Sequence, residues 1–147
     1  MKTRVLIVDD EKEFADALTE RLRIRDYDVT ASPSGEDAVT KIKGYNFDVV
    51  ILDVAMPGMD GIETLQKIKG IKPLTEVIML TGHATVETAI EGMKLGAHDY
   101  LMKPCETDDL VSKINRAFEK KKEQEERIRE ARVREIISSP RAVLREK

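Results

Sequence analysis

Short apolar runs alternate with helical patterns along most of the chain, and this alternation is the strongest constraint on its fold. Five runs predict β-strands, at residues 4–9, 27–32, 47–53, 76–82 and 98–103. Amphipathic patterns predict helices at residues 11–24, 34–44, 61–71 and 85–97, with a last helix from Thr107. Strands that alternate with helices pair in parallel through right-handed crossovers. The sequence therefore predicts a doubly wound five-stranded parallel sheet in a three-layer α/β/α sandwich.

Two features of the strand and helix patterns locate elements more closely. The run FDVVILD at 47–53 is the most apolar, which places it at the centre of the sheet, whereas YDVTAS at 27–32 alternates like a peripheral strand. Ser34 stands where a helix cap is expected, and Gly44 stands near the end of the same helix.

The last segment differs in composition from the rest. Residues 119–135 contain 13 charged side chains out of 17, and three Glu–Arg pairs four residues apart favour a helix: Glu123–Arg127, Glu125–Arg129 and Glu130–Arg134. We expect residues 1–118 to form one domain and residues 119–147 to form a charged helical extension, frayed or disordered from Ser138 because Pro140 breaks a helix. The extension is either solvated or a partner-dependent coiled coil, although no clean heptad seam is visible.

Charge and cysteine content exclude several classes of protein. The net charge is −3, made up of −6 over residues 1–118 and +3 over residues 119–147, which argues against direct binding of nucleic acid. Cys105 is the single cysteine, so an internal disulfide is excluded, and no Cys/His spacing suggests zinc. The N-terminal apolar run is too short for a signal peptide or membrane span. We expect a cytoplasmic protein without membrane insertion.

Polar residues stand where the predicted strands end. They are Asp9-Asp10, Asp53, Thr81-Gly82 and Lys103-Pro104. Because the carboxyl ends of parallel strands meet at one edge, these groups converge there. Three neighbouring acids repel one another unless a cation joins them, and oxygen-only ligands suit Mg²⁺, with Mn²⁺ as an alternative. A carboxylate beside Mg²⁺ and a lysine can attack a phosphoryl group and hold the acyl phosphate.

These residues, together with DVAMPGMDG at 53–61 and Tyr100, resemble the receiver domain of two-component response regulators, a CheY-like, flavodoxin-like fold. The resemblance covers about residues 3–118. It implies that Asp53 is the phosphoacceptor and that Lys103 is the counter-charge of the phosphoryl group. Thr81 and Tyr100 are the implied switch residues. The implied metal ligands are Asp10 directly, Asp9 largely through water, Asp53, and the backbone carbonyl of Ala55. The Lys103–Pro104 bond is expected to be cis.

The stretch from Thr81 to Pro104 most resembles receivers of sigma-54-dependent activators. The chain contains no Gly-Lys-Ser/Thr phosphate loop, so we expect its output to be a protein contact rather than DNA binding. The resemblance implies a histidine kinase or phosphotransfer protein as the phosphoryl donor. It also implies a homodimer formed through residues 85–118 or through the C-terminal helix.

Two other functions compete with this hypothesis. A flavin- or nucleotide-binding module is disfavoured because DDEKEF at 9–14 would repel phosphate without a metal. A scaffold with a silent acidic pocket remains the alternative. We expect no enzymatic activity beyond phosphotransfer to the protein itself and hydrolysis of its own acyl phosphate.

Four other residues carry smaller expectations. His98 is expected to be a plain surface residue and Cys105 to be inert. Ala55 and His83 are expected to flank the site with opposing effects on water access.

Overall fold

The computed structural model describes residues 1–82 and 85–138, and within them it confirms the predicted fold. The strands are β1 (Arg4–Val8), β2 (Asp28–Ser32), β3 (Val49–Leu52), β4 (Glu76–Thr81) and β5 (Asp99–Met102). The helices are α1 (Lys12–Ile24), α2 (Gly35–Gly44), α3 (Gly61–Ile71), α4 (Val86–Lys94) and α5 (Thr107–Ser138). All neighbouring strands pair in parallel in the order β2-β1-β3-β4-β5.

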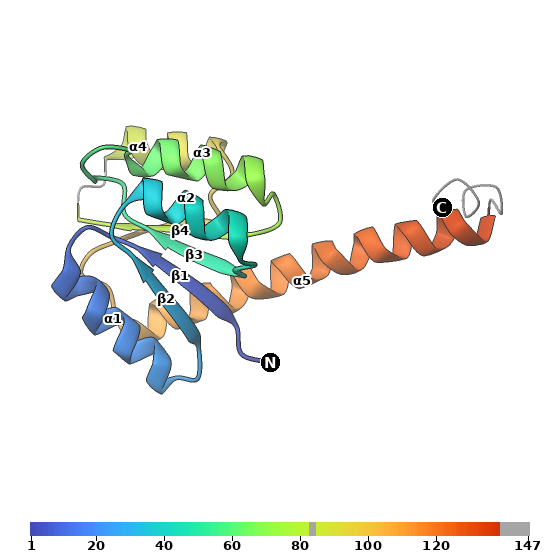
Figure 1. The fold of residues 1–147 in the computed structure, drawn as a ribbon, viewed down its shortest axis with the longest axis horizontal. Coiled ribbons are helices and arrows are strands. Elements are labelled where there is room, and N and C mark those ends of the chain that lie inside the picture. The colour runs from blue at the N-terminus through green and yellow to red at the C-terminus, as the bar shows by residue number, and fades with distance from the viewer. Residues whose placement is uncertain (83–84, 139–147) are drawn as a thin grey trace.

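The helices cover both faces of the sheet, with α2, α3 and α4 on one side and α1 and α5 on the other (Figure 1). Each face has its own apolar cluster, and successive residues of β1 alternate between the two. Val5 and Ile7 pack in the cluster with Leu22 of α1, whereas Leu6 and Val8 pack in the cluster of α2 and α3. Burial on both faces explains why these strands read as continuous apolar runs.

The order of the strands agrees with the sequence pattern. The most apolar strand, β3, is central and entirely buried, and the alternating strand, β2, is at an edge. Two side chains donate hydrogen bonds to backbone carbonyls of β2. Arg23 donates to the Val29 carbonyl at 2.9 Å, and Lys41 donates to the Ala31 carbonyl at 2.9 Å. These bonds fill acceptors that an exposed edge strand would otherwise offer to another chain.

Helix boundaries follow local chemistry. The Ser34 side chain accepts a hydrogen bond from the Asp37 N–H at 3.1 Å, which confirms the expected cap of α2. The predicted helix at 85–97 is shorter in the structure, where α4 ends at Lys94. Gly96 has a φ of +102°, a conformation that suits glycine and terminates the helical path.

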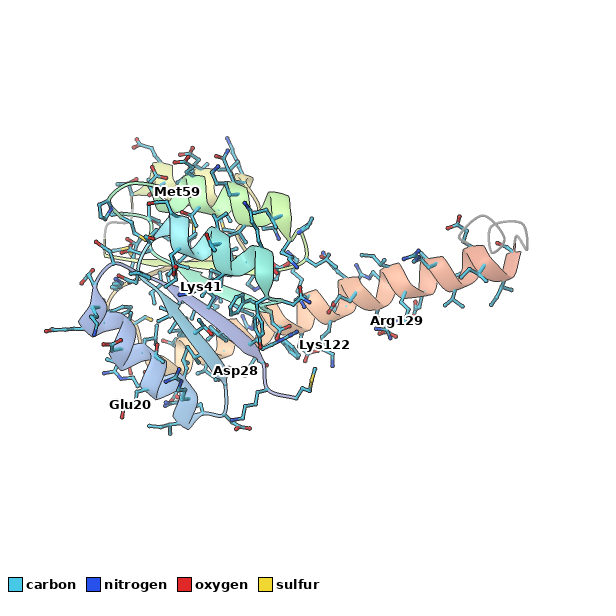
Figure 2. The ribbon with its side chains drawn as sticks, in the orientation of Figure 1. Glu20, Asp28, Lys41, Met59, Lys122 and Arg129 are labelled. Carbon is cyan, nitrogen blue, oxygen red and sulfur yellow. The ribbon has the colours of Figure 1, made fainter. Side chains whose placement is uncertain are left out.

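The last helix is long and continues well beyond the domain. In Figure 1, α5 packs along the sheet and then projects away from it, and Figure 2 shows Lys122 near the exit and Arg129 on the projecting part. Of the predicted Glu–Arg pairs, Glu130–Arg134 lies at 3.7 Å, whereas Arg129 pairs with Glu126 and Glu125 with Lys121. Ser138, where fraying was expected to begin, is still helical as the last residue of α5, and residues 139–147 lie outside the described residues.

Two buried carboxylates stand at the end of the sheet where β3 and β4 begin. Asp48 is 5% exposed and Glu76 is 1% exposed. The Lys121 ammonium lies 3.0 Å from Asp48, and the Lys120 ammonium lies 3.5 Å from Glu76. Arg4 also contacts Asp48, through its backbone N–H at 2.8 Å and its guanidinium at 3.5 Å. The first turn of the charged extension is therefore still attached to the sheet.

His98 belongs to this same cluster, so the expectation of a plain surface residue is wrong. Its side chain is 17% exposed, and its Nδ1 lies 3.6 Å from a Glu76 carboxylate oxygen. Burial lowers the pKa of His98 and the charge of Glu76 opposes that effect only in part. Sequence periodicity does not reveal this position because His98 precedes β5 and meets β4 only in the folded sheet.

Replacing Lys121 by Met should destabilise the domain, because it removes a cation from buried Asp48 while keeping the apolar stem. Arg4 remains as a partner, so we expect a loss of about 1–3 kcal/mol in unfolding free energy, measured by denaturant titration. Lys122→Met changes the exposed neighbour on the same helix and should leave stability nearly unchanged. Equal effects of the two substitutions would contradict the anchoring role of Lys121.

Candidate functional site

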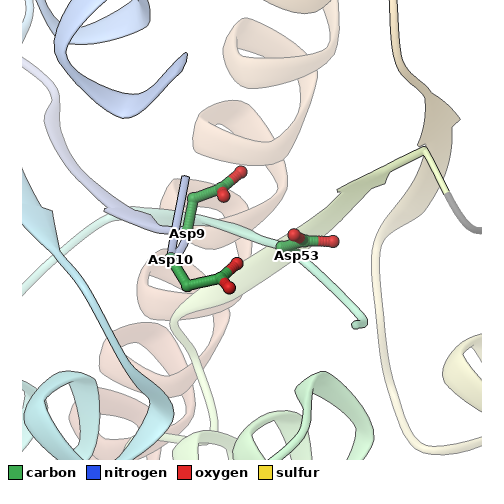
Figure 3. A group of neighbouring side chains, drawn as sticks. All are labelled: Asp9, Asp10 and Asp53. Carbon is green, nitrogen blue, oxygen red and sulfur yellow. The ribbon is translucent and has the colours of Figure 1, made fainter. Parts of the chain in front are cut away.

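Three carboxylates meet beyond the ends of β1 and β3 (Figure 3). Asp9 and Asp10 follow β1 and Asp53 follows β3, and one oxygen of each lies within 4.8 Å of the others. Asp9 and Asp53 are 3% and 2% exposed, whereas Asp10 is exposed to solvent. The adjacent parallel strands β1 and β3 bring these acids together as the sequence predicted.

Asp53 is held by its backbone as well as by its neighbours. Its N–H donates to the Val8 carbonyl at 3.0 Å, which extends the β1–β3 pairing by one step. One carboxylate oxygen accepts from the Ala55 N–H at 3.3 Å. Ala55 itself is exposed to solvent. His83, the other expected flanking residue, lies outside the described residues.

The turn after Asp53 depends on two glycines. Gly58 has a φ of +76°, which favours glycine. At Gly61, an added Cβ would lie 2.3 Å from the Asp53 carbonyl oxygen and 2.5 Å from the Val54 Cα. The Gly61 N–H donates to the Val54 carbonyl at 2.8 Å, and Asp60 caps α3 by accepting from the Glu63 N–H at 2.9 Å. The start of α3 is thereby pressed against the backbone of Asp53.

Lys103 reaches the acids from the end of β5. Its ammonium lies 2.7 Å from Asp9, 3.2 Å from Glu11 and 3.7 Å from Asp53. Its backbone N–H donates to the Thr81 carbonyl at 2.8 Å, and the Lys103–Pro104 bond is cis. Burial lowers the pKa of Lys103, but the hydrogen bond and charge of Asp9 and the charge of Asp53 outweigh burial, so the pKa is raised.

The single positive charge of Lys103 does not balance the negative charge of the carboxylates in the site. Burial raises the pKa of Asp9, and the hydrogen bond from Lys103 offsets this only in part. The repulsion of Asp53 acts in the same direction as burial. A site with clustered carboxylate oxygens and a penalty for their negative charge fits a hard divalent cation, and the donor set of Asp9, Asp10 and Asp53 fits Mg²⁺.

The two expected switch residues lie on neighbouring strands. Thr81 ends β4 and is fully buried, while Tyr100 on β5 is half-buried and packs against the α2–α3 cluster. The Tyr100 hydroxyl lies 3.1 Å from the Thr88 hydroxyl of α4. Tyr100 therefore links β5 to α4.

Sequence reasoning missed two contacts of Lys103. Glu11 and Phe14 lie within DDEKEF at 9–14, at the start of the predicted helix, and the sequence did not identify either as a partner of Lys103, yet both contact the ammonium. The sequence shows that Glu11 and Phe14 follow closely after Asp10. It does not show that Lys103, at the end of β5, lies next to the first turn of α1. Cys105 agrees with its expected inertness, since burial and nearby Asp109 and Glu106 raise the pKa of its thiol.

Comparison with known proteins identifies the family. Residues 5–115 match the family described as the response regulator receiver domain, and the chain belongs to it. Transcriptional regulatory protein ZraR of Escherichia coli (strain K12) is 40% identical over 114 residues, which cover 78% of this chain and 26% of ZraR. Transcriptional regulatory protein FixJ of Bradyrhizobium diazoefficiens is 36% identical over 117 residues, 80% of this chain and 57% of FixJ. The chain thus spans about a quarter of ZraR and just over half of FixJ.

Solved structures agree with this assignment. A CheY-like response regulator receiver domain protein from Methanospirillum hungatei JF-1 superposes with a TM-score of 0.82 at 30% identity, covering 84% of this chain and 99% of that one. A receiver domain protein from Clostridium thermocellum gives a TM-score of 0.76 at 36% identity, covering 82% and 97%. Receiver domains are signalling switches that bind Mg²⁺ at an acidic pocket and interact with histidine kinases or phosphotransfer proteins.

None of the helices in the described part of the chain combines the length and the apolar composition that a membrane span needs.

Gly61→Ala should displace the backbone of Asp53 or shift α3, because the added methyl group overlaps backbone atoms that cannot rotate away. We expect a loss of about 1–3 kcal/mol in unfolding free energy. Gly70→Ala is the matched control on the same helix, because a methyl group there would meet no neighbouring atom within 4 Å, and alanine should be neutral or stabilising. Denaturant titration distinguishes the two, and equal stability of both variants would refute the close approach.

Proposed function

We propose that this protein is a phosphorylation-driven switch in which Asp53 accepts a phosphoryl group from a histidine kinase or phosphotransfer protein. The observation that supports this function best is the placement of Asp53. Its carboxylate is 2% exposed, shares the strand ends with Asp9 and Asp10, and lies 3.7 Å from the Lys103 ammonium. A buried nucleophile flanked by a cation and metal-type ligands suits phosphoryl transfer.

In the proposed reaction, an Asp53 oxygen attacks the phosphorus of a phosphohistidine. A P–O bond forms and the P–N bond breaks, and the electron pair returns to the imidazole nitrogen, which takes up a proton. Asp9, Asp10, Asp53 and the Ala55 carbonyl would hold Mg²⁺, or Mn²⁺, which supplies positive charge to the transferring oxygens. Lys103 supplies a second positive charge from the end of β5.

The phosphorylated form would differ from the resting form mainly around Thr81, Lys103 and Tyr100. A phosphoryl group adds roughly −1.5 to −2 charge and strong acceptors. Thr81 and Lys103 gain these acceptors, and Tyr100 repacks against α4 as the end of β4 moves. Attack of water on phosphorus, with cleavage of the Asp53 P–O bond, returns the carboxylate and releases inorganic phosphate. The protein needs no other catalytic activity for this cycle.

The surface that carries the output is proposed to be the face of α4, β5 and α5. Four apolar side chains on α4 and β5 are exposed: Val86, Ile90, Met93 and Met102. We propose that this face, or the projecting part of α5, forms a homodimer or binds a partner protein in the cytoplasm without contacting nucleic acid itself. In this proposal residues 1–118 are the receiver and residues 119–147 are the charged extension. Whole relatives are named as transcriptional regulators, so a regulatory role in transcription belongs to the same proposal.

Asp53→Asn should abolish phosphorylation by acetyl phosphate, because the amide cannot form the acyl phosphate. Intact-protein mass spectrometry after incubation with Mg²⁺ measures the added phosphoryl group, and chelation of the metal should prevent it in the parent protein. Asp28→Asn changes an exposed aspartate on β2 and should leave labelling unchanged. Labelling of Asp53→Asn at the parental level would exclude Asp53 as the acceptor and favour a scaffold with a silent pocket.

Ile90→Arg should weaken self-association of the activated protein, since a charge would have to be buried in the proposed α4–β5–α5 interface. Ile90 is 50% exposed, and Ile24, which is 77% exposed on α1, provides the control Ile24→Arg. Sedimentation velocity with beryllofluoride and Mg²⁺ should show a dimer for the parent and the control only. A monomeric parent, or a dimeric Ile90→Arg variant, would contradict dimerisation through this face.

A further inference from the structure

We propose that Phe14 is a positioning residue for Lys103, whose ammonium it holds beside Asp53 for phosphoryl transfer. Phe14 lies in the first turn of α1, and the Lys103 Nζ lies 4.0 Å from the centroid of its ring. This inference rests on the function proposed above and adds to it a residue from a different element than the acids and the lysine.

The ring is itself held in place. Phe14 is half-buried and packs against the apolar cluster that includes Leu18 of α1 and Ile114 of α5. The Lys103 side chain is only 11% exposed, so the ammonium lies in a confined space between the ring and the acids. A packed aromatic face at this distance attracts a cation through its quadrupole.

The carboxylates around Lys103 do not by themselves direct its ammonium to Asp53. The nearest is Asp9 at 2.7 Å, and Glu11 at 3.2 Å is closer than Asp53 at 3.7 Å. The Glu11 side chain is 60% exposed, so solvent screens its attraction for the ammonium. Lysine is a flexible side chain with a point charge, and it keeps one position only when its surroundings define it.

Phe14 holds the ammonium in a way that the carboxylates cannot. Its ring attracts the ammonium without accepting a hydrogen bond, so it leaves the N–H donors available to Asp9 now and to phosphoryl oxygens later. It also occupies one side of the ammonium with apolar surface, where water would otherwise bind. Small misplacement of a charged group in a phosphoryl-transfer site costs rate because catalysis there depends on positioning.

The test compares Phe14→Leu, which keeps apolar bulk and removes the ring, with Phe14→Tyr, which keeps the ring face. We expect Phe14→Leu to be phosphorylated by acetyl phosphate on the order of threefold to tenfold more slowly, a fold-change in keeping with loss of one cation–π contact. Phe14→Tyr should retain a rate near that of the parent. Phe118→Leu makes the same change at a half-buried phenylalanine packed against the same cluster, and it should not change the rate.

A second readout needs neither metal nor phosphate. In the parent and in Phe14→Tyr, the ε-methylene protons of Lys103 lie by the ring face, so nuclear magnetic resonance should show them shifted upfield from those of the other lysines. Phe14→Leu should abolish the shift, and Lys103→Met identifies the signal by its loss.

The proposal is overturned if Phe14→Leu keeps the parental rate, if Phe14→Tyr slows as much as Phe14→Leu, or if Phe118→Leu slows equally. It is also overturned if the Lys103 signal does not depend on the ring. None of these outcomes affects the role of Asp53, which is decided separately by Asp53→Asn. Unlabelled parent protein, in contrast, would remove the proposed function while the resonance experiment still tests the contact between Phe14 and Lys103.

Discussion

The parallel pairing of all five strands is the constraint on which the rest of this structure depends. Parallel strands place all their carboxyl ends at one edge of the sheet and all their amino ends at the other. Asp53 and Thr81 therefore lie at the edge where β3 and β4 end, and Asp48 and Glu76 lie at the edge where they begin. The strands β3 and β4 therefore each have one buried polar residue at their start and another at their end.

The two edges differ in how their negative charge is balanced. Asp48 is contacted by Arg4 and Lys121, and Glu76 is surrounded by Lys69, His98 and Lys120 within 4 Å. The lysine and arginine cations among these residues compensate the negative charge at this edge, which also holds the start of the projecting part of α5. The opposite edge gathers more carboxylates around Lys103 than one ammonium can neutralise, which leaves it suited to a metal ion and a phosphoryl group. The same type of side chain thus anchors a helix at one edge and forms the candidate reactive site at the other.

The candidate site was predictable to the extent that it lies at strand ends. Asp9, Asp53 and Lys103 each follow an apolar run, and parallel topology then brings them together without further information. Glu11, Phe14 and Gly61 could not be assigned from pattern alone. Their roles depend on distances across elements: a lysine from β5 over the first turn of α1, and the start of α3 against the backbone of Asp53. His98 was misplaced for the same reason, because its partner Glu76 begins a neighbouring strand.

The sequence by itself determined the number, type and order of the elements, since apolar periodicity and capping residues act within a few positions of the chain. It also determined which residues end the strands. Only the tertiary structure decided which charges neighbour each other, how far α5 remains attached to the sheet, and which ring faces Lys103. Those contacts join positions far apart in the chain, such as Lys121 with Asp48 and Lys103 with Phe14. Their geometry follows from how helices pack on a twisted sheet, which no local pattern encodes.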